Sequence, residues 1–356
     1  MAVLRSIPQL ESLAAEWNSL ADRAGHALLR HEWFLSAAHT LHAHDALMVV
    51  ANRDASGRLC GVAPLVATNS HGPARMELLG ASVLHEPAGF LCADADAQAS
   101  LLESVFELGQ PMVLQRIVPE SVPSIPAGRS ASKRGLLMSR PAPACLGVEF
   151  DASDVPYLES LSGKLRYDLR RARTRAEASG GTKFEAIAPT RTELDSLFDE
   201  FLVVEAAGWK GRRGSALAAN SKLRAFFRFY CERTAEEGTL RMFRLLVGGK
   251  PVAVQMAVEM YRRLWVLKIG YDESMARCSP GLLLTGDAIR YAFDRGLQSY
   301  EFLGAIEPWE ERWRPRRREH QFLLFYPWTV AGCIGVSIDA VGAGWRQVKR
   351  AAGLIA

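Results

Sequence analysis

The sequence predicts a mixed α/β fold, an α+β arrangement around a mixed sheet, built from two similar halves. Residues 45–68 and 238–260 share one pattern: a β-rich run, a turn that contains glycine and a second apolar run, as in a β-hairpin. In both halves a strand, a loop, a helix and a further strand then follow. A repeated order of elements is typical of a duplicated domain.

The composition predicts an ordinary folded protein of two domains. The 356 residues are 49% hydrophobic and carry a formal net charge of +4, a basic excess too small to indicate nucleic-acid binding. The six cysteines are scattered without a CxxC pair, so neither a zinc site nor a disulfide framework is expected. The N-terminal residues lack the unbroken apolar core of a secretory signal, and we expect a cytoplasmic protein.

The first half is predicted to span residues 1–150. Its hairpin is followed by an apolar run over 76–91 and by an acidic, alanine-rich helix over 94–108. Residues 121–135 are rich in Pro, Ser and Gly, which indicates an exposed loop. The apolar residues over 139–150 then predict a short strand that leads out of this half.

The second half is predicted to span residues 151–330 and begins with a basic helix. Residues 155–180 place leucines three and four positions apart among Lys and Arg and end at Gly-Gly, the pattern of an amphipathic helix or helix pair. A helix over 190–209 is expected because a Thr cap is followed three residues later by Glu. A third helix is expected over 221–237.

A tail over 331–356 follows the second half. Residues 322–345 form the most apolar stretch of the chain, but Asp339 and several glycines interrupt it, so no transmembrane segment is expected. The expected structure is a closing amphipathic helix that docks on the core. Contact with an anionic membrane surface stays open as an alternative, because basic residues follow the stretch. They are Arg346, Lys349 and Arg350.

The most informative motif is a Ser-Pro-Gly turn that opens an apolar helix over 282–293. Pro280 suits the first turn of a helix, Gly281 allows another group to approach the backbone, and no acid precedes Asp287. Free first-turn amides and the helix dipole favour a phosphate at such a start. The alternative is an ordinary helix start, because Ser-Pro begins many helices that bind nothing.

The neighbouring strands favour the ligand interpretation. The strand before the motif ends in Tyr271 and Asp272, and the strand after it carries Glu301 among apolar residues. In α/β sheets, ligands bind outside the carboxyl ends of strands beside a helix N-terminus. We therefore expect these residues to face one pocket.

Several stretches of the second half resemble a known family. They are LSGKLRYDLRRARTRAEASGGTKFE, the GW at 208–209, KIGYDESMARCSPGLLL and RGLQSYEFLGAIEPWEERW. In this order they resemble the GNAT-superfamily acyltransferases of the cellulose-biosynthesis CelD/BcsL group, which are related to Fem-type aminoacyltransferases. The resemblance covers residues 12–328 and implies a tandem GNAT-like fold with two fused halves.

The resemblance implies direct transfer of an acyl group, in a ternary complex, from acyl-CoA or an acyl carrier protein to a small-molecule amine or hydroxyl. It maps the pyrophosphate of the donor onto the loop-to-helix turn, at Arg277, Ser279, Pro280, Gly281, Leu282 and Leu283. Glu301 or Asp272 is then the expected base and Tyr271 the proton donor to the leaving sulfur. A backbone N–H near Lys268 and Ile269 is expected to hold the thioester oxygen.

A further set of residues is predicted to bind the acceptor or a carrier protein. It comprises Lys164, Arg166, Arg170, Trp209, Lys210, Gln255 and Glu307. For the three basic helix residues, a solvated face is the alternative; for Trp209 and Lys210, an ordinary packed Trp and loop. No metal is expected, because the histidines of HTLHAH have no carboxylate or Cys nearby to complete a set of ligands.

Two departures from the family pattern leave the function open. Asp94 and Asp96 begin the corresponding helix of the first half and would repel a phosphate, so a single donor site is expected. The usual aromatic-Lys pair is Trp309-Glu310 here. The alternatives are Fem-like aminoacyl transfer from aminoacyl-tRNA, disfavoured because the basic helix lacks interleaved aromatics, and a non-catalytic partner of a polysaccharide or export apparatus.

Overall fold

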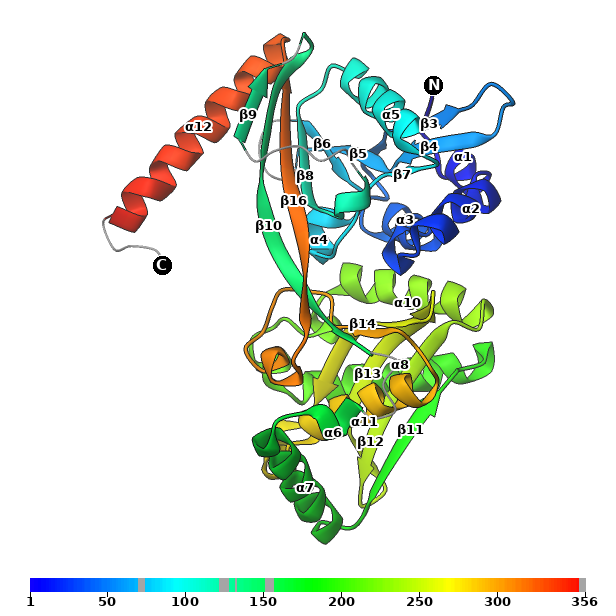
Figure 1. Ribbon diagram of the computed structural model, residues 1–356, viewed down its shortest axis with the longest axis vertical. Coiled ribbons are helices and arrows are strands. Elements are labelled where there is room, and N and C mark those ends of the chain that lie inside the picture. Colours follow the sequence, from blue (N-terminus) through cyan, green and yellow to red (C-terminus); the bar gives the residue numbers. More distant parts are fainter. Residues whose placement is uncertain (70–73, 122–127, 132, 151–156, 352–356) are drawn as a thin grey trace. The chain divides into compact units, whose positions relative to one another are not determined.

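The computed structural model describes residues 1–69, 74–121, 128–131, 133–150 and 157–351 (Figure 1). The chain forms two compact units from interleaved segments. Unit 1 contains Met1–Ala24, His42–Pro143 and Glu319–Ala356, and unit 2 contains Gly25–Leu41 and Ala144–Arg318. Each unit combines a sheet with helices, and the mixed α/β fold class predicted from the sequence is confirmed.

The units do not follow the predicted boundaries at residues 150 and 330. The largest difference is helix α3 (His31–Thr40), which belongs to unit 2 although it lies near the N-terminus. The indole of Trp33 packs edge-on against Phe226 and Tyr230 of α10 (Ser221–Glu236), with ring centroids 4.8 and 5.0 Å apart. These rings are fully buried, so α3 completes the core of unit 2.

The sheet of unit 2 has the strand order β11-β12-β13-β14-β15-β10. All neighbouring strands are antiparallel except β14 and β15, which are parallel and joined by helix α11. The bounds are β11 (Thr182–Ile187), β12 (Leu240–Val247), β13 (Lys250–Met260), β14 (Arg263–Tyr271), β15 (Ser299–Glu301), β10 (Gly135–Glu149) and α11 (Pro280–Asp294). A parallel pair requires such a crossover connection.

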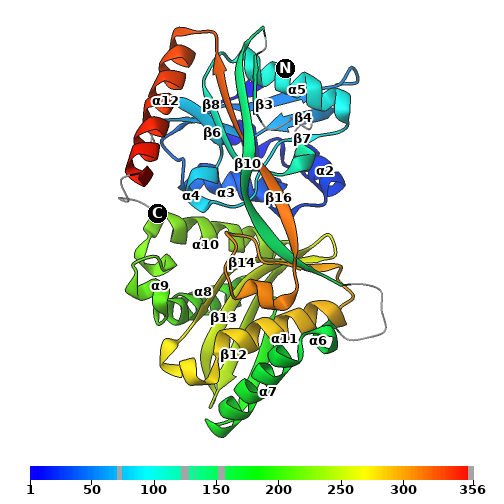
Figure 2. The same cartoon turned by 60° about the vertical axis from the view of Figure 1, so that its left-hand side comes forward.

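Helices cover both faces of this sheet (Figure 2). On one face, α7 (Gly163–Ala178) and α11 share a core with alternate residues of β13, among them Ala253 and Ala257. On the other face lie α8 (Arg191–Ala206) and α10; the Met256 sulfur lies 3.3 Å from Cys231 of α10. The two-residue alternation of β13 thus separates the two helix layers.

The predicted helix starts of unit 2 are confirmed by their caps. Thr190 and Glu193 form the capping box of α8, where the Thr190 amide donates to the Glu193 carboxylate at 2.9 Å. The Asn220 side chain caps α10 by accepting from the Leu223 amide at 3.1 Å. Each hydrogen bond satisfies an amide at the start of its helix that has no carbonyl partner in that helix.

Unit 1 repeats the order of elements in a looser form. Its sheets run β1-β3-β4-β7 and β16-β8-β6-β5-β2, and β6 and β8 form a parallel pair joined across α5. The bounds are β1 (Ala2–Leu4), α1 (Ile7–Glu11), α2 (Ala14–Ala24), β2 (Ala46–Leu47), β3 (Val49–Arg53), β4 (Leu59–Ala63), β5 (Leu65–Thr68), β6 (Arg75–Leu78), α4 (Ala81–Leu84), β7 (Leu91–Cys92), α5 (Ala95–Glu107), β8 (Met112–Ile117) and β16 (Arg316–Pro327). Each unit therefore contains one parallel pair of strands joined by a crossover helix, and this arrangement is what the two units share.

One prediction for the connecting segments changes, and the prediction of a closing helix is confirmed. Within the predicted loop over 121–135, β9 (Gly128–Ala131) pairs with β10 as a hairpin, while 122–127 and 132 lie outside the described residues. The predicted closing helix is α12 (Val330–Ala351), held to unit 1 where Arg75 donates to Asp339 at 3.1 Å. None of the helices in the described ranges has the length and hydropathy needed to cross a membrane.

Candidate active site

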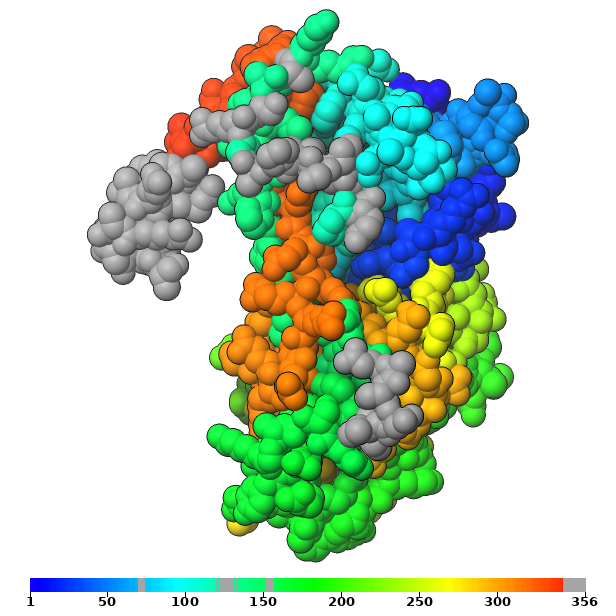
Figure 3. Space-filling view, in the orientation of Figure 1, coloured from blue at the N-terminus to red at the C-terminus, as the bar shows by residue number. Residues whose placement is uncertain are grey.

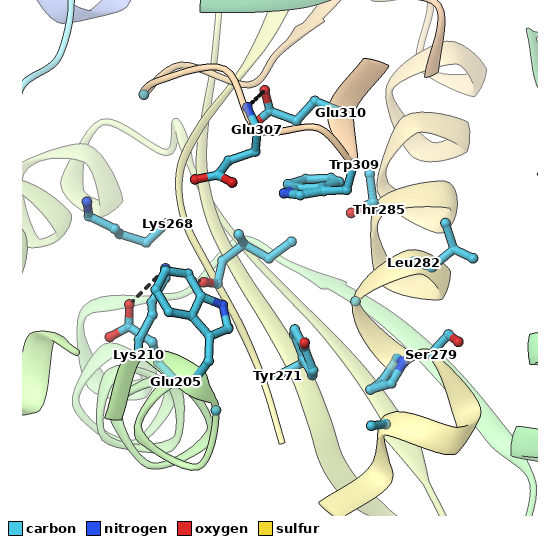
Figure 4. A pocket seen from close by; sticks show the side chains of 18 of the residues that line it. Glu205, Lys210, Lys268, Tyr271, Ser279, Leu282, Thr285, Glu307, Trp309 and Glu310 are labelled. Carbon is cyan, nitrogen blue, oxygen red and sulfur yellow. Dashed lines mark hydrogen bonds and ion pairs between the residues drawn. The ribbon is translucent and has the colours of Figure 1, made fainter. Parts of the chain in front are cut away.

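A cavity of about 790 Å³ opens in unit 2 where β14 and β15 separate (Figure 4). The two strands pair only from Arg263 to Trp265 on β14, opposite Ser299 to Glu301 on β15. Beyond this point β14 continues to Tyr271, whereas the chain after β15 turns away through two positive φ angles, 57° at Leu303 and 59° at Gly304. Among the residues that the structure describes, no strand pairs with this edge of β14 beyond Trp265.

A β-bulge in β14 sets which side chains line this cavity. Ala257 of β13 pairs with Val266, but Met256 pairs with Lys268, so Leu267 is the extra residue. An inserted residue reverses the alternation of side chains beyond it. Consequently Ile269 and Tyr271 face the α11 side, while Lys268 turns toward α10, its ammonium 4.9 Å from the Phe227 ring centroid.

The bulged segment presents backbone groups of Ile269 to the cavity. The Asp272 amide donates to Val252 of β13 at 2.9 Å, so residues 268, 270 and 272 direct their backbone groups toward β13. The backbone groups of Ile269 therefore point to the unpartnered edge. Its carbonyl accepts a hydrogen bond from Lys210 Nζ at 2.6 Å, and its N–H points in the same direction.

Lys210 is held beside this edge by a buried carboxylate. Its Nζ lies 3.2 Å from Glu205 Oε1, and the other oxygen of Glu205 accepts from the Leu217 amide at 2.8 Å. Burial lowers the pKa of Lys210 from its ordinary value, with Glu205 opposing and Lys268 adding to that shift. The lysine is thus fixed in position, with a side chain only 21% exposed.

Two glycines allow the end of α8 to lie against β14. A Cβ on Gly208 would lie 2.7 Å from the Tyr271 carbonyl oxygen, and one on Gly270 would lie 2.6 Å from Glu205 Cα. At these distances the Cβ atom of any other residue would clash with the neighbouring backbone. The glycines therefore bring Glu205 and the short helix α9 (Trp209–Arg212) to the wall of the cavity.

The opposite wall is the start of α11, whose first turn has free amides. Ser279 precedes the helix in the left-handed region at φ 48° and makes no side-chain cap, and the first turn contains no acid. The Leu283 amide donates to Ser279 O at 3.2 Å, which leaves the amides of Gly281 and Leu282 without a carbonyl of the helix. Both residues line the cavity.

The corresponding helix of unit 1 begins differently. The Asp94 carboxylate caps α5 by accepting from the Ala97 amide at 2.8 Å, and Asp96 lies in the first turn. The cap occupies one first-turn amide, and the two carboxylates give this helix start a negative charge that disfavours an anion. This is the local contrast that the sequence predicts between the two helices.

The loop after β15 closes the cavity with one exposed and one buried carboxylate. Glu310 is 5% exposed and accepts from the Glu307 amide at 3.2 Å, so it fastens the loop. Glu307 is exposed, and Figure 4 shows its side chain in the space that Lys210, Tyr271 and Trp309 also face. The Trp309 ring packs edge-on against Phe302, with centroids 5.5 Å apart.

The structure brings many predicted site residues together around this cavity. They are Trp209, Lys210, Lys268, Ile269, Tyr271, Ser279, Pro280, Gly281, Leu282 and Glu307. Sequence reasoning missed Glu205, although an acid beside the apolar residues Phe201 and Val204 of a helix, just before Gly-Trp-Lys, is a usable signal. It also missed Arg213 and Arg312, for which we find no comparable signal.

Glu301, predicted as the base, does not line the cavity. It is 2% exposed, lies where β14 and β15 are still paired, and is bound by Arg318 Nη2 at 2.8 Å and by the Ser299 hydroxyl at 2.6 Å. Its surroundings are those of a buried ion-pair partner. We do not retain the prediction that it is the base.

The other predicted residues lie outside the cavity, where Asp272, Leu283 and Gln255 have structural roles and the basic residues are exposed. The Asp272 carboxylate accepts from the Ser274 amide at 2.8 Å and begins the short helix over Glu273–Cys278, where Arg277 is exposed. Leu283 is buried in the core, and the Gln255 side chain accepts from the Tyr300 hydroxyl at 2.9 Å. Three predicted basic residues are exposed on α7. They are Lys164, Arg166 and Arg170. Figure 3 shows the surface of the segment that contains this helix in green.

A family of known proteins matches the part of the chain that contains this cavity. Residues 163–311 match the acetyltransferase (GNAT) domain family. This stretch runs from α7 to the loop that closes the cavity, and it contains every residue that lines the cavity except Arg312. The match supports an N-acyltransferase with an acetyltransferase (GNAT) domain over these residues.

Solved structures with the same fold cover 90–91% of this chain. FemX is 13% identical, with a TM-score of 0.58 over 91% of this chain and 97% of that one. L-PGS from Bacillus licheniformis is also 13% identical, with a TM-score of 0.52 over 90% and 92% of the two chains. A conserved protein of unknown function from Bacteroides thetaiotaomicron VPI-5482 is 12% identical, with a TM-score of 0.55 over 91% and 99%. Among curated protein sequences none matches.

Proposed function

We propose that the chain transfers an acyl group from a pantetheine thioester, acyl-CoA or an acyl carrier protein, to an amine, with both substrates bound at once. One observation carries the proposal: a single cavity contains the unpartnered edge of β14 and the uncapped first turn of α11. A strand edge suits the amide-rich pantetheine arm, and free helix amides suit a phosphate. Assignment to the CelD/BcsL group remains part of this proposal.

The donor is proposed to bind across these two elements. The amides of Gly281 and Leu282, aided by the helix dipole, would hold the pyrophosphate, or the phosphate of a carrier-bound pantetheine. Ile269 N–H would then donate to the thioester oxygen. The absence of an acid in the first turn of α11 favours this arrangement.

Ile269 and Lys210 would stabilise the oxyanion. As the amine attacks the thioester carbon, the carbonyl π pair moves to the oxygen, which accepts from Ile269 N–H and lies beside the Lys210 ammonium. The intermediate collapses when this pair returns and the C–S bond breaks. Lys210 uses two of its three N–H groups on Ile269 O and Glu205, so the third remains for the oxyanion.

Proton transfer is assigned to the two remaining groups that face the cavity. The Glu307 carboxylate would take the proton that the amine loses, in place of Glu301. The Tyr271 hydroxyl stays the proposed donor to the leaving thiolate, since its ring lies beside Gly281 on the donor side. Trp209 and Lys210, which the sequence predicts to bind the acceptor, also line this cavity.

Calorimetry with CoA and acetyl-CoA tests the proposal. Gly281→Glu places a carboxylate where the phosphate is expected to bind, and Gly281→Gln is a neutral control of nearly the same size. A control is needed because a Cβ at Gly281 would lie 3.2 Å from the Tyr271 ring. We expect Glu to weaken CoA binding at least about tenfold more than Gln.

Ala225→Glu on the exposed surface of α10 adds the same charge outside the cavity and should leave CoA binding unchanged. Failure of the wild-type chain to bind any pantetheine thioester would refute the proposed donor. Binding of aminoacyl-tRNA in its place would select the Fem-like alternative. Binding without any acyl transfer to amines would select a non-catalytic role.

A further inference from the structure

Helix α12 exposes a line of apolar side chains. Val330, Ile334, Ile338 and Val341 are 78%, 49%, 46% and 62% exposed, and Trp328, just before the helix, is 57% exposed. Spacings of four, four and three residues place the helix positions on one face. Elsewhere in the described residues the exposed large apolar side chains are scattered along the sequence.

The opposite face of α12 is the one that holds it to unit 1. Gly332 and Gly335 are buried there, and a Cβ on Gly335 would lie 3.4 Å from the Tyr326 ring. Asp339 accepts from the Tyr326 hydroxyl at 2.6 Å and pairs with Arg75 at 3.1 Å. The exposed line is therefore not used in folding unit 1, and the helix acid is neutralised on the inner face.

The charges in the sequence of α12 indicate what the exposed line binds. After Val341, the helix sequence contains Arg346, Lys349 and Arg350 and no acid. An apolar line, a Trp at its start and a purely cationic continuation match the boundary of an anionic bilayer, where apolar side chains enter the acyl region and cations attract headgroups.

We propose that α12, together with Trp328, docks this protein on the surface of an anionic phospholipid bilayer. The helix lies flat, with Val330, Ile334, Ile338 and Val341 in the headgroup and acyl boundary. This inference uses no residue of the cavity in unit 2. Its test is therefore independent of the proposed acyl transfer.

Cosedimentation of the full chain with lipid vesicles tests this inference. Vesicles of phosphatidylcholine mixed with phosphatidylglycerol should bind the chain at least about tenfold more tightly than phosphatidylcholine alone, since each basic residue near an anionic surface contributes to binding. Ile338→Glu should weaken binding at least about tenfold, because it removes an apolar side chain from the boundary and adds a charge.

Ala340→Glu is the matched control, because it adds the same charge at an exposed position about 120° around the helix from the middle of the line. We expect it to change binding less than about threefold, and both variants should unfold at the wild-type temperature. Equal loss in the two variants, or no binding to either vesicle, would overturn the proposal. Self-association that Ile338→Glu abolishes, without vesicle binding, would assign the face to a second copy.

Discussion

Replacing Lys210 with methionine separates the proposed catalytic role of this residue from its structural role. Methionine keeps most of the apolar length but removes the ammonium that contacts Ile269 O at 2.6 Å and Glu205 at 3.2 Å. Loss of one oxyanion donor lowers kcat by about 10²–10³, or about 3–4 kcal/mol. Loss of one partner from a buried ion pair costs about 3–5 kcal/mol of stability. Because the Lys210 side chain is 21% exposed, we expect about 3 kcal/mol.

The double variant Lys210→Met with Glu205→Gln distinguishes these two effects. The introduced glutamine is neutral and can still accept from the Leu217 amide, so most of the free energy of unfolding should return. The oxyanion donor stays absent, so kcat should remain about 10²–10³ lower. Urea unfolding and acyl-transfer assays at saturating acyl-CoA measure the two quantities. Recovery of wild-type kcat in the double variant would refute the oxyanion role.

The pH dependence of stability and of kcat provides a second test of the role of Lys210. Because burial lowers the pKa of Lys210 below its ordinary 10.5, the folded chain releases this proton at a lower pH than the unfolded chain does. Between the lowered pKa and 10.5 the unfolded state binds more protons, so this group makes stability rise with pH. Over the same window kcat should fall, since the ammonium is lost. Lys210→Met should remove both trends.

Two further predictions concern the framework of unit 2. Gly208→Ala should destabilise the fold by about 1–3 kcal/mol in urea unfolding, because its Cβ would lie 2.7 Å from the Tyr271 carbonyl oxygen. Gly163→Ala, with open space around its Cβ, should be neutral, and equal losses would contradict the close-approach argument. Burial and the Glu32 carboxylate raise the pKa of Glu237 from 4.5 to about 7. Between these two pH values the folded state binds more protons than the unfolded state, so the free energy of unfolding falls as pH rises. This pKa shift corresponds to about 3 kcal/mol, which solvent screening reduces because the Glu237 side chain is 31% exposed. Glu237→Gln should therefore flatten the fall by about 2 kcal/mol between acidic and neutral pH, and an unchanged slope would assign it to another group.

The fold class follows from local patterns, but the composition of the units does not. Hairpins, helix caps and the order of elements are encoded within short segments, which is why the repeat and the capping box of Thr190 and Glu193 were predictable. Helix α3 is buried around most of its circumference, including His31, Glu32 and Trp33. Such a helix lacks the one-sided apolar pattern that indicates its partner. Its place in unit 2 was therefore not visible in the sequence.

The candidate site was predictable where one short motif specifies it and unpredictable where strand geometry decides. The Ser-Pro-Gly turn alone indicates the uncapped start of α11. Glu301, in contrast, looks suitable because β15 follows the motif, yet the strands diverge only after this residue. The bulge at Leu267 likewise reverses the alternation of β14, and nothing in the residues themselves marks it.

The two crossover helices explain why one repeated fold would carry one donor site. Both α5 and α11 join the strands of a parallel pair, so both begin at the position where such folds bind ligands. At α5 the Asp94 carboxylate occupies the Ala97 amide and adds negative charge, whereas α11 begins with no side-chain cap and no acid. The cap stabilises the fold by about 1 kcal/mol, but it occupies an amide that an anion would otherwise bind. Every residue that lines the cavity belongs to unit 2, where that cap is missing, and this difference between the two helix starts is why we propose unit 2 as the catalytic half.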